Sequence, residues 1–145
     1  MEIRISPHSL EYRVIYGDTD QMGVVYHANY LRFFEASRTE YLRVRGFTYR
    51  EVEEGGFMMP VAEAALKYHS PARYDDLILV ETLPDPKVRV GFRFNYRIFR
   101  KETEELLVSG HTLHACMEAS TGRVIRPPKD MVAKVFLDMP VTKAL

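Results

Sequence analysis

The most constraining feature of this sequence is a strict alternation of apolar and polar residues from Val88 to Ile98. Every second side chain is apolar, and the positions between them hold arginine, glycine or asparagine. Side chains of a β-strand point alternately to the two faces of a sheet, so the pattern predicts a long strand with one buried and one polar face. The apolar face of such a strand needs a second layer of structure to cover it.

Other segments also predict strands, and most of them lie in the second half of the chain. They cover residues 11–16, 58–69, 77–83 and 106–118. Pro71 closes the second of these, a turn begins at Thr121-Gly122, and Pro127-Pro128 interrupts the chain before a short amphipathic tail. Strands that follow each other through short turns pair in antiparallel fashion.

One long helix is predicted between residues 29 and 44, where the spacing of the apolar residues changes from two to three or four. The residues expected on its buried stripe are Tyr30, Phe33, Phe34, Ser37, Tyr41 and Val44. Asn29 is a candidate cap for the first turn, and Gly46 is a natural stop. A shorter helix follows, because Thr48 and Glu51 match a capping box and Gly55-Gly56 ends it.

The order of elements, a strand, a long helix and then several strands, predicts one α+β domain over residues 1–145. One helix covers only part of one face of such a sheet, and long strands leave exposed edges that proteins usually pair or cover. We therefore expect a homo-oligomer, at least a dimer, with a tetramer as the larger assembly.

Charge and cysteine content narrow the class of function. Lys plus Arg and Asp plus Glu both count 20, so the zero formal net charge gives no long-range attraction to nucleic acid or to an anionic membrane. No apolar run reaches the roughly 20 residues of a membrane-spanning helix, and the N-terminus lacks the pattern of a secretory signal. Cys116 is the only cysteine, which excludes an intrachain disulfide. The expected location is the cytoplasm, with no stable membrane insertion.

The densest group of chemically useful side chains is formed by Asp18, Asp20 and His27, just before the long helix. The first N–H groups of a helix lack partners and its dipole is positive there, so this place stabilises an anion or a developing oxyanion. Two other interpretations stay open. The aspartates can serve only to bond the backbone of a glycine-flanked turn, or the three side chains can bind a metal, although they match no ligand spacing.

At this cluster the sequence resembles a known family. Residues 16–20 (YGDTD) and 23–30 (GVVYHANY) resemble the signature of the 4-hydroxybenzoyl-CoA thioesterase family. The similarity is closest to its YbgC-like, Tol–Pal-associated branch of acyl-CoA thioesterases, and it continues through residues 34–35, 38–40 and 71–76. The resemblance implies the hotdog fold, in which a curved antiparallel sheet wraps around one long central helix. It also implies that two subunits join their sheets, with the active sites at the interface.

The resemblance further implies the residues of the site. Asp20 takes the place of the family's catalytic aspartate, and His27 takes the place whose backbone N–H, at the helix start, holds the thioester carbonyl. Tyr16, Tyr26 and Asn29 belong to the same motifs and are candidate substrate-binding residues. The implied substrate is an acyl-CoA with a short- to medium-chain or aromatic acyl group, or the corresponding acyl carrier protein thioester. No metal or other cofactor is expected.

One carboxylate suffices for this chemistry. A thiol with an ordinary pKa of about 8.5 leaves as thiolate without a strong general acid. Asp20 can attack the carbonyl to form a mixed anhydride, or it can deprotonate a water molecule, and the residues alone do not choose between these routes. The N–H of His27 would stabilise the oxyanion, an effect typically worth about 3 kcal/mol.

Four further side chains are reactive or bind metals in other proteins. Cys116 lies in a strand pattern with no histidine base beside it, which favours a buried structural thiol. Ser109 is not part of a Gly-x-Ser-x-Gly nucleophile motif. His111 and His114 fall on opposite faces of one strand and therefore cannot share a metal.

Glu35 on the predicted helix is the alternative catalytic carboxylate, although a pair with Arg38 favours a solvated position for it. Several basic residues are either solvated or available to the phosphates of CoA or to an acidic carrier protein. They are Arg89, Arg93, Arg97, Arg100 and Lys101 near the alternating strand, and Arg123 and Arg126 beside the turn at Gly122.

Two other classes of function compete with hydrolysis. A hotdog enoyl-CoA hydratase or dehydratase would need a histidine and an acid placed to move a proton beside a carbonyl. Asp20 and His27 supply both side chains, but their spacing does not match the pattern expected for a hydratase. A non-catalytic acyl-binding or scaffold protein would hold the same ligand without turnover.

Overall fold

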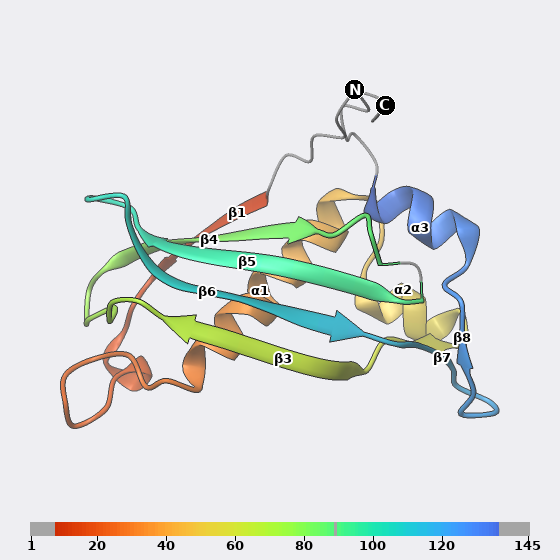
Figure 1. The fold of residues 1–145 in the computed structure, drawn as a ribbon, viewed down its shortest axis with the longest axis horizontal. Coiled ribbons are helices and arrows are strands. Elements are labelled where there is room, and N and C mark those ends of the chain that lie inside the picture. Colours follow the sequence, from red (N-terminus) through yellow and green to blue (C-terminus); the bar gives the residue numbers. More distant parts are fainter. Residues whose placement is uncertain (1–7, 89, 137–145) are drawn as a thin grey trace.

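A curved antiparallel sheet forms the larger layer of the protein, in a computed structural model that describes residues 8–88 and 90–136 (Figure 1). Its strands run in the order β1-β4-β5-β6-β3, and every neighbouring pair is antiparallel. Their bounds are β1 (His8–Arg13), β3 (Val61–Tyr68), β4 (Leu77–Pro84), β5 (Phe92–Arg100) and β6 (Glu105–His114). The outermost strands of this sheet are therefore β1 and β3.

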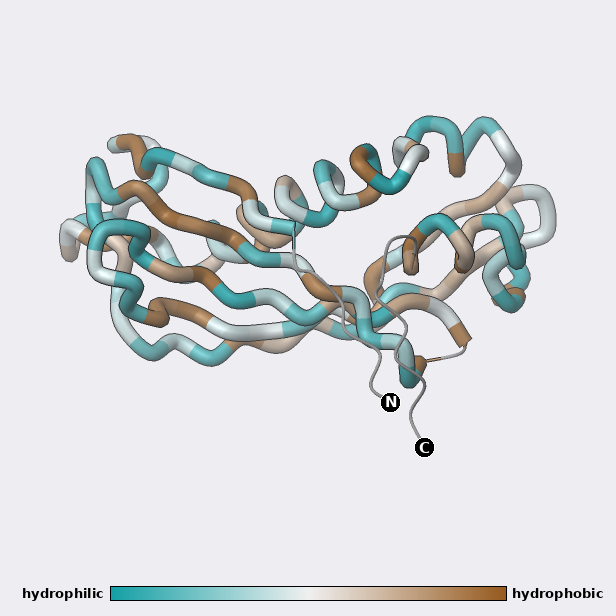
Figure 2. The backbone as a smooth tube through the Cα atoms, turned by 90° about the horizontal axis from the view of Figure 1, so that it is seen from above, coloured by the Kyte–Doolittle hydropathy of each residue, from teal (hydrophilic) through white to brown (hydrophobic). Residues whose placement is uncertain are grey.

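The second layer is the long helix α1 (Asn29–Val44), around which the sheet curves. The view from above separates this helix from the sheet (Figure 2). Smaller elements gather at one end of the molecule (Figure 1): α2 (Tyr49–Glu54), a sheet of β2 (Phe57–Met58), β7 (Cys116–Glu118) and β8 (Val124–Ile125), and α3 (Lys129–Val135). The predicted α+β arrangement of a curved sheet around one long helix is confirmed. None of the described helices is long and apolar enough to cross a membrane.

Helix α1 has the predicted bounds and most of the predicted buried stripe. Its buried residues are Tyr30, Phe33, Phe34, Ser37, Tyr41 and Leu42. Val44 was wrongly placed on this stripe: it is 61% exposed, because the helix ends there and Gly46, at φ +102°, turns the chain away. Asn29 is not the cap, since Ala28 holds that position and makes no side-chain capping bond. Thr48 does cap α2, where its hydroxyl accepts the N–H of Glu51.

The contact between α1 and the sheet leaves no spare room at its centre. The ring of Phe34 stacks on that of Tyr96 in β5, with centroids 4.2 Å apart. Gly110 of β6 lies beneath the same ring, and a Cβ there would meet Phe34 at 3.0 Å and the carbonyl oxygen of Ala65 at 2.4 Å. Only a residue without a side chain fits such a gap.

The alternating segment forms β5, but the strand begins at Phe92 rather than at Val88. The buried side chains follow the predicted period: Phe92, Phe94, Tyr96 and Ile98. Val90 is 64% exposed, so the alternation before Gly91 does not mark the core. Gly91 breaks the pattern because it has φ +142° and lies against His114, whose carbonyl oxygen would be 2.1 Å from an added Cβ.

Two of the other predicted strands are divided in the structure. The segment 58–69 splits into β2 and β3 at Pro60, which has no N–H to give to a ladder and whose carbonyl accepts the N–H of Ala115 at 3.1 Å. The segment 106–118 splits at that same Ala115 into β6 and β7, which belong to different sheets. The first strand covers His8–Arg13 rather than 11–16, since the chain turns into a short 3-10 helix at Tyr16–Asp18.

A chain of polar side chains crosses the core beneath α1. Arg38 donates to the hydroxyl of Tyr96 at 3.0 Å, and the hydroxyls of Tyr96 and Thr112 lie 2.6 Å apart. The Nε2 of His114 lies 2.8 Å from the hydroxyl of Thr112, and its Nδ1 lies 3.3 Å from the carbonyl of Met59. The predicted pair of Glu35 with Arg38 is therefore wrong, because Arg38 turns inward to this chain of bonds.

His114 makes the stability of this core depend on pH. Burial, assisted by the charge of Arg38, lowers the pKa of His114 to about 4 from its ordinary value of 6.5. The unfolded chain therefore binds more protons between these values, and the free energy of unfolding falls as the pH drops from 6.5 to 4. The loss attributable to this one group is at most about 3 kcal/mol.

We predict that His114→Gln weakens this pH dependence, although the substitution itself lowers stability at neutral pH. Urea unfolding of both proteins between pH 7 and 4 measures the difference in slope. His111→Gln is the matched control, because His111 lies on the other face of the same strand. Equal slopes for wild type and His114→Gln would contradict the prediction.

Candidate functional site

Asp18 anchors the loop that joins β1 to α1. Its buried carboxylate accepts the hydroxyl of Tyr12 at 2.7 Å and the N–H of Ile15 at 2.9 Å. Its carbonyl oxygen accepts the N–H of Tyr26 and the side-chain amide of Asn29, each at 2.9 Å. One residue thus ties together the end of β1, the loop and the first turn of α1. Asp18 therefore serves to bond the backbone of this turn, which is one of the interpretations that the sequence left open.

Asp20 lies at the start of a tight turn and is only half-buried. Its N–H donates to the carbonyl of Val24, and its carbonyl accepts the N–H of Gly23, both at 2.9 Å. Gly23 closes the turn with φ +77°, a conformation that other residues rarely adopt. One carboxylate oxygen accepts the N–H of Met22 at 2.9 Å. The other oxygen has no donor among the described residues and is available for chemistry.

His27 stands immediately before the N-cap of α1. No acceptor for its backbone N–H is found in the described part of the chain. Its carbonyl accepts the hydroxyl of Tyr68, at the end of β3, at 3.0 Å. The imidazole is exposed, lies 4.5 Å from the ring of Tyr26 and makes no hydrogen bond to a described residue.

A cavity of about 270 Å³ brings Asp20 and His27 together. It lies between the loop, the beginning of α1 and the connection that follows β3. Its lining residues are Asp20, Met22, Val24, Val25, His27, Tyr30, Tyr68, His69, Ser70 and Pro71. The walls are mainly apolar, while Asp20, His27, His69 and Ser70 are polar residues of the lining, a composition typical of small-molecule sites.

Backbone contacts hold the two sides of this cavity at a fixed separation. The N–H of Val25 donates to the carbonyl of Ala72 at 2.8 Å, and the N–H of Ala72 donates to the hydroxyl of Tyr30 at 3.1 Å. Burial raises the pKa of Tyr30, so its hydroxyl stays protonated at neutral pH. Arg100 adds a bond to the carbonyl of Pro71 at 2.9 Å and an ion pair with Asp76 at 3.2 Å.

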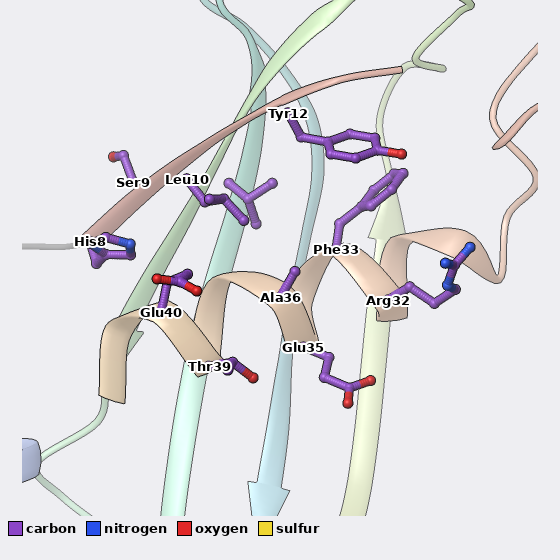
Figure 3. Close-up of a pocket in the computed structure, with 11 residues that line it drawn as sticks. His8, Ser9, Leu10, Tyr12, Arg32, Phe33, Glu35, Ala36, Thr39 and Glu40 are labelled. Carbon is purple, nitrogen blue, oxygen red and sulfur yellow. The ribbon is translucent and has the colours of Figure 1, made fainter. Parts of the chain in front are cut away.

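A larger cavity of about 610 Å³ lies between β1 and α1 (Figure 3). It has an apolar base that includes Leu10 and Phe33, and its α1 side carries Glu35 and Glu40. Both carboxylates project from inside a helix, where backbone N–H groups are already bonded to carbonyls of the preceding turn. This cavity therefore offers no free backbone N–H of α1, although it contains the alternative carboxylate, Glu35.

The remaining predicted site residues do not line the Asp20 cavity of this chain. Tyr16 is 74% exposed and stacks on Tyr74, with centroids 3.9 Å apart. Tyr26 is exposed beside His27, and Asn29 uses its amide to hold Asp18. Arg126 is exposed and follows β8, at the end of the molecule opposite the loop (Figure 1). Their roles as substrate-binding residues stay predictions.

Most of the basic residues proposed for CoA phosphates already have carboxylate partners. Arg97 pairs with Glu81 at 2.8 Å, and Lys101 pairs with Glu11. Arg93 lies 3.9 Å from Asp85, and Arg100 contacts both Asp76 and Glu105. No ion pair of Arg123 or Arg126 is found within residues 8–88 and 90–136, and Arg89 lies outside the described residues. These ion pairs favour a structural role for the four paired residues, Arg93, Arg97, Arg100 and Lys101.

The environments predicted for Cys116, His111 and His114 are confirmed. Cys116 is buried, and burial raises the pKa of its thiol, which disfavours the thiolate. His111 pairs with Glu63 at 2.9 Å, on the opposite face of β6 from His114. Within residues 8–88 and 90–136 no three His, Cys, Asp or Glu side chains are arranged to hold a metal. Asp18, Asp20 and His27 thus do not form a ligand set.

Sequence reasoning named only Asp20 and His27 of this lining, and the residues it missed include Tyr68, His69 and Ser70. Tyr68 ends β3, and His69 and Ser70 follow it, far from Asp20 in the sequence. Polar side chains between a strand and Pro71 were the only available signal, and it gives no information about which loop they would face.

Comparisons with known proteins show which proteins this chain is similar to. Residues 14–135 match the family model described as the Thioesterase-like superfamily. The acyl-CoA thioesterase YbgC of Haemophilus influenzae is 39% identical over 127 residues, which cover 86% of this chain and 91% of that protein.

Solved structures share the fold. A 1,4-dihydroxy-2-naphthoyl-CoA thioesterase from Synechocystis superposes with a TM-score of 0.86 at 24% identity, over 93% of this chain and 100% of that one. A mutant 4-hydroxybenzoyl CoA thioesterase complexed with 4-hydroxybenzoyl CoA gives 0.80 at 22% identity, over 89% and 98% of the two chains. The predicted hotdog fold is confirmed.

The two aspartates of the loop are predicted to differ in their effect on stability. Asp18→Ala leaves the Tyr12 hydroxyl and the Ile15 N–H without their acceptor, and should lower the free energy of unfolding by about 1–3 kcal/mol. Asp20→Asn keeps an acceptor for Met22 and should change it by less than about 0.5 kcal/mol. Urea unfolding at pH 7 compares them, and an equal loss in both variants would contradict the assignment.

Proposed function

Because this chain belongs to the thioesterase-like superfamily, we propose that it hydrolyses acyl-CoA to a free acid and CoA, with Asp20 as the catalytic carboxylate. The predicted family and the class of thioester hydrolase are confirmed by the match over residues 14–135 and by the YbgC relative. The observation that supports the choice of residue is the cavity whose lining includes both Asp20, with one carboxylate oxygen unbonded among the described residues, and His27, just before the start of α1.

The geometry supports a simple division of roles. The thioester carbonyl would enter the cavity with its oxygen toward the N–H of His27, which has no partner in the described chain. The helix dipole of α1 adds to this stabilisation as the oxyanion develops. Asp20 would then either attack the carbonyl carbon or remove a proton from an attacking water molecule. In both routes the thiolate leaves without a general acid.

Size and lining of the cavity favour a small acyl group. A volume of about 270 Å³ lies just below the range of about 300–1,000 Å³ common for ligand pockets. Met22, Val25 and Tyr30 offer apolar and aromatic surface to a short chain or a single ring. We therefore propose short- to medium-chain or aromatic acyl groups, carried by CoA or by an acyl carrier protein.

We predict that Asp20→Asn lowers kcat by about 10³-fold or more on every good substrate, since the amide neither attacks nor accepts a proton. Thiol release from a panel of acyl-CoAs, followed with a thiol reagent, measures this. Glu35→Gln is the matched control and should keep wild-type activity, because Glu35 lines the other cavity. Full activity of Asp20→Asn, with loss in Glu35→Gln, would move the site to the larger cavity.

We also propose that the working unit is a dimer joined through β3. Among the described residues this edge strand pairs only with β6, and nearly all of its side chains are exposed. An open strand of this length is a template for a second strand. Tyr68 and His69 lie at its end and line the Asp20 cavity, so a partner joined here would complete the wall of the site.

The dimer is tested by placing a charge on this edge. Ala64 is exposed and opposes the buried Thr112, so it faces the helix side of the sheet. Ala64→Arg is predicted to give a monomer in size-exclusion chromatography with light scattering, with activity reduced at least about 10-fold. Thr103→Arg, in the exposed turn between β5 and β6, is the control and should stay dimeric. A wild type that is monomeric and fully active would refute the dimer.

A further inference from the structure

Met22 presents a large apolar side chain to solvent at the edge of the Asp20 cavity. Met22 is 78% exposed, whereas Val25 and Tyr30, which line the same cavity, are buried. Removal of apolar surface from water is favourable, so a ligand that covers this side chain gains affinity from the contact. Met22 is therefore a point at which a bound molecule can be recognised.

The backbone of Met22 is fixed directly beside the carboxylate of Asp20. The N–H of Met22 donates to one carboxylate oxygen of Asp20 at 2.9 Å, and the N–H of Gly23 donates to the carbonyl of Asp20 at 2.9 Å. The same tight turn thus holds the proposed catalytic group and the start of the Met22 side chain. A substrate atom that reacts with Asp20 therefore lies close to Met22.

The other apolar side chains that line this cavity are held in place. The hydroxyls of Tyr30 and Tyr68 are hydrogen-bonded to backbone groups of other residues, at 3.1 and 3.0 Å. The two valines of the lining have a stiff side-chain torsion, and Pro71 is a closed ring. Met22, in contrast, is unbranched and has three rotatable bonds and a polarizable thioether, which lets methionine adapt to ligands of different shape.

We propose that Met22 determines which acyl groups this protein accepts, because its side chain folds over the acyl group bound beside Asp20. The inference rests on the proposed thioesterase function and adds the residue that sets its substrate preference. A cavity of about 270 Å³ holds a small acyl group within its fixed walls. The Met22 side chain then closes over this group and removes apolar surface of both from water. A longer acyl group has to extend past Met22 and holds the side chain open.

The test compares kcat/KM across a panel of straight-chain and aromatic acyl-CoAs. Met22→Ala removes the closing side chain and leaves its space to larger groups. The ratio of kcat/KM between the smallest and the largest acyl group that the wild type hydrolyses should therefore fall by about 10-fold. Met22→Leu, which is similar in size but branched, should change this ratio less than Met22→Ala does. Both substitutions are at an exposed position, so the fold should be retained.

Gln21→Ala is the matched control for an effect of the turn itself. Gln21 precedes Met22 in the same turn and is exposed, but it does not line the cavity of the described chain. Its profile across the panel should be that of the wild type. A Met22→Ala protein that loses the same factor on every acyl group, or that keeps the wild-type profile, overturns the proposal.

Methionine methyl signals in NMR give a readout that does not depend on turnover. The chain has seven methionines, and the methyl resonance that disappears in Met22→Leu is that of Met22. A non-hydrolysable ketone analogue of an acyl-CoA that the wild type hydrolyses should shift this resonance, whereas CoA alone should leave it unchanged. An equal shift with CoA alone would place Met22 against the pantetheine arm and overturn the proposal.

Failure of the proposal differs from failure of the proposed function. If the wild type releases no thiol from any acyl-CoA, the thioesterase assignment fails, and the role of Met22 fails with it. If the wild type is active and Asp20→Asn is inactive, the assignment stands. The role of Met22 is then decided by the acyl profile of Met22→Ala and by the methyl signal.

Discussion

The packing of α1 against the curved sheet is the constraint on which the site depends. Phe34 stacks on Tyr96, and Gly110 provides the space beneath that ring. This contact fixes the helix axis relative to β3 and β6, and so fixes where the first turn of the helix lies. The buried carboxylate of Asp18 then ties the incoming loop to that turn. Asp20 and His27 are thus positioned by groups that take no part in the proposed chemistry.

Local sequence patterns predicted those parts of the fold that local physics determines. The period of α1 gave its bounds, because the burial of one helix face is encoded every three or four residues. The alternation predicted β5 but not the residue at which it begins. The strand starts after Gly91, which lies close to His114, and no local pattern encodes that contact. Likewise, no residue near Ala115 predicted that this segment divides between two sheets. The division depends on the hydrogen bond from the N–H of Ala115 to the carbonyl of Pro60, which is distant in the sequence.

The candidate site shows the same limit. The pairing of a carboxylate with a helix start was readable because Asp20, His27 and the helix are neighbours in the sequence. Tyr68, His69 and Ser70 were missed, since only the β3–β6 pairing and the contact between Val25 and Ala72 bring them to the loop. Two neighbouring aspartates of similar appearance have different environments: the carboxylate of the buried Asp18 accepts two hydrogen bonds on one oxygen, whereas that of the half-buried Asp20 accepts only the N–H of Met22 among the described residues.

Gly110 has a consequence for how the sequence of this protein can vary. Its Cα lies where the strand, the Ala65 carbonyl and the Phe34 ring leave no volume for even a methyl group. Any larger residue would lift the helix off the sheet, and the first turn of the helix would move with it. The alignment of groups in the proposed site therefore depends on an absent side chain in the middle of a strand, at a position that lines neither cavity.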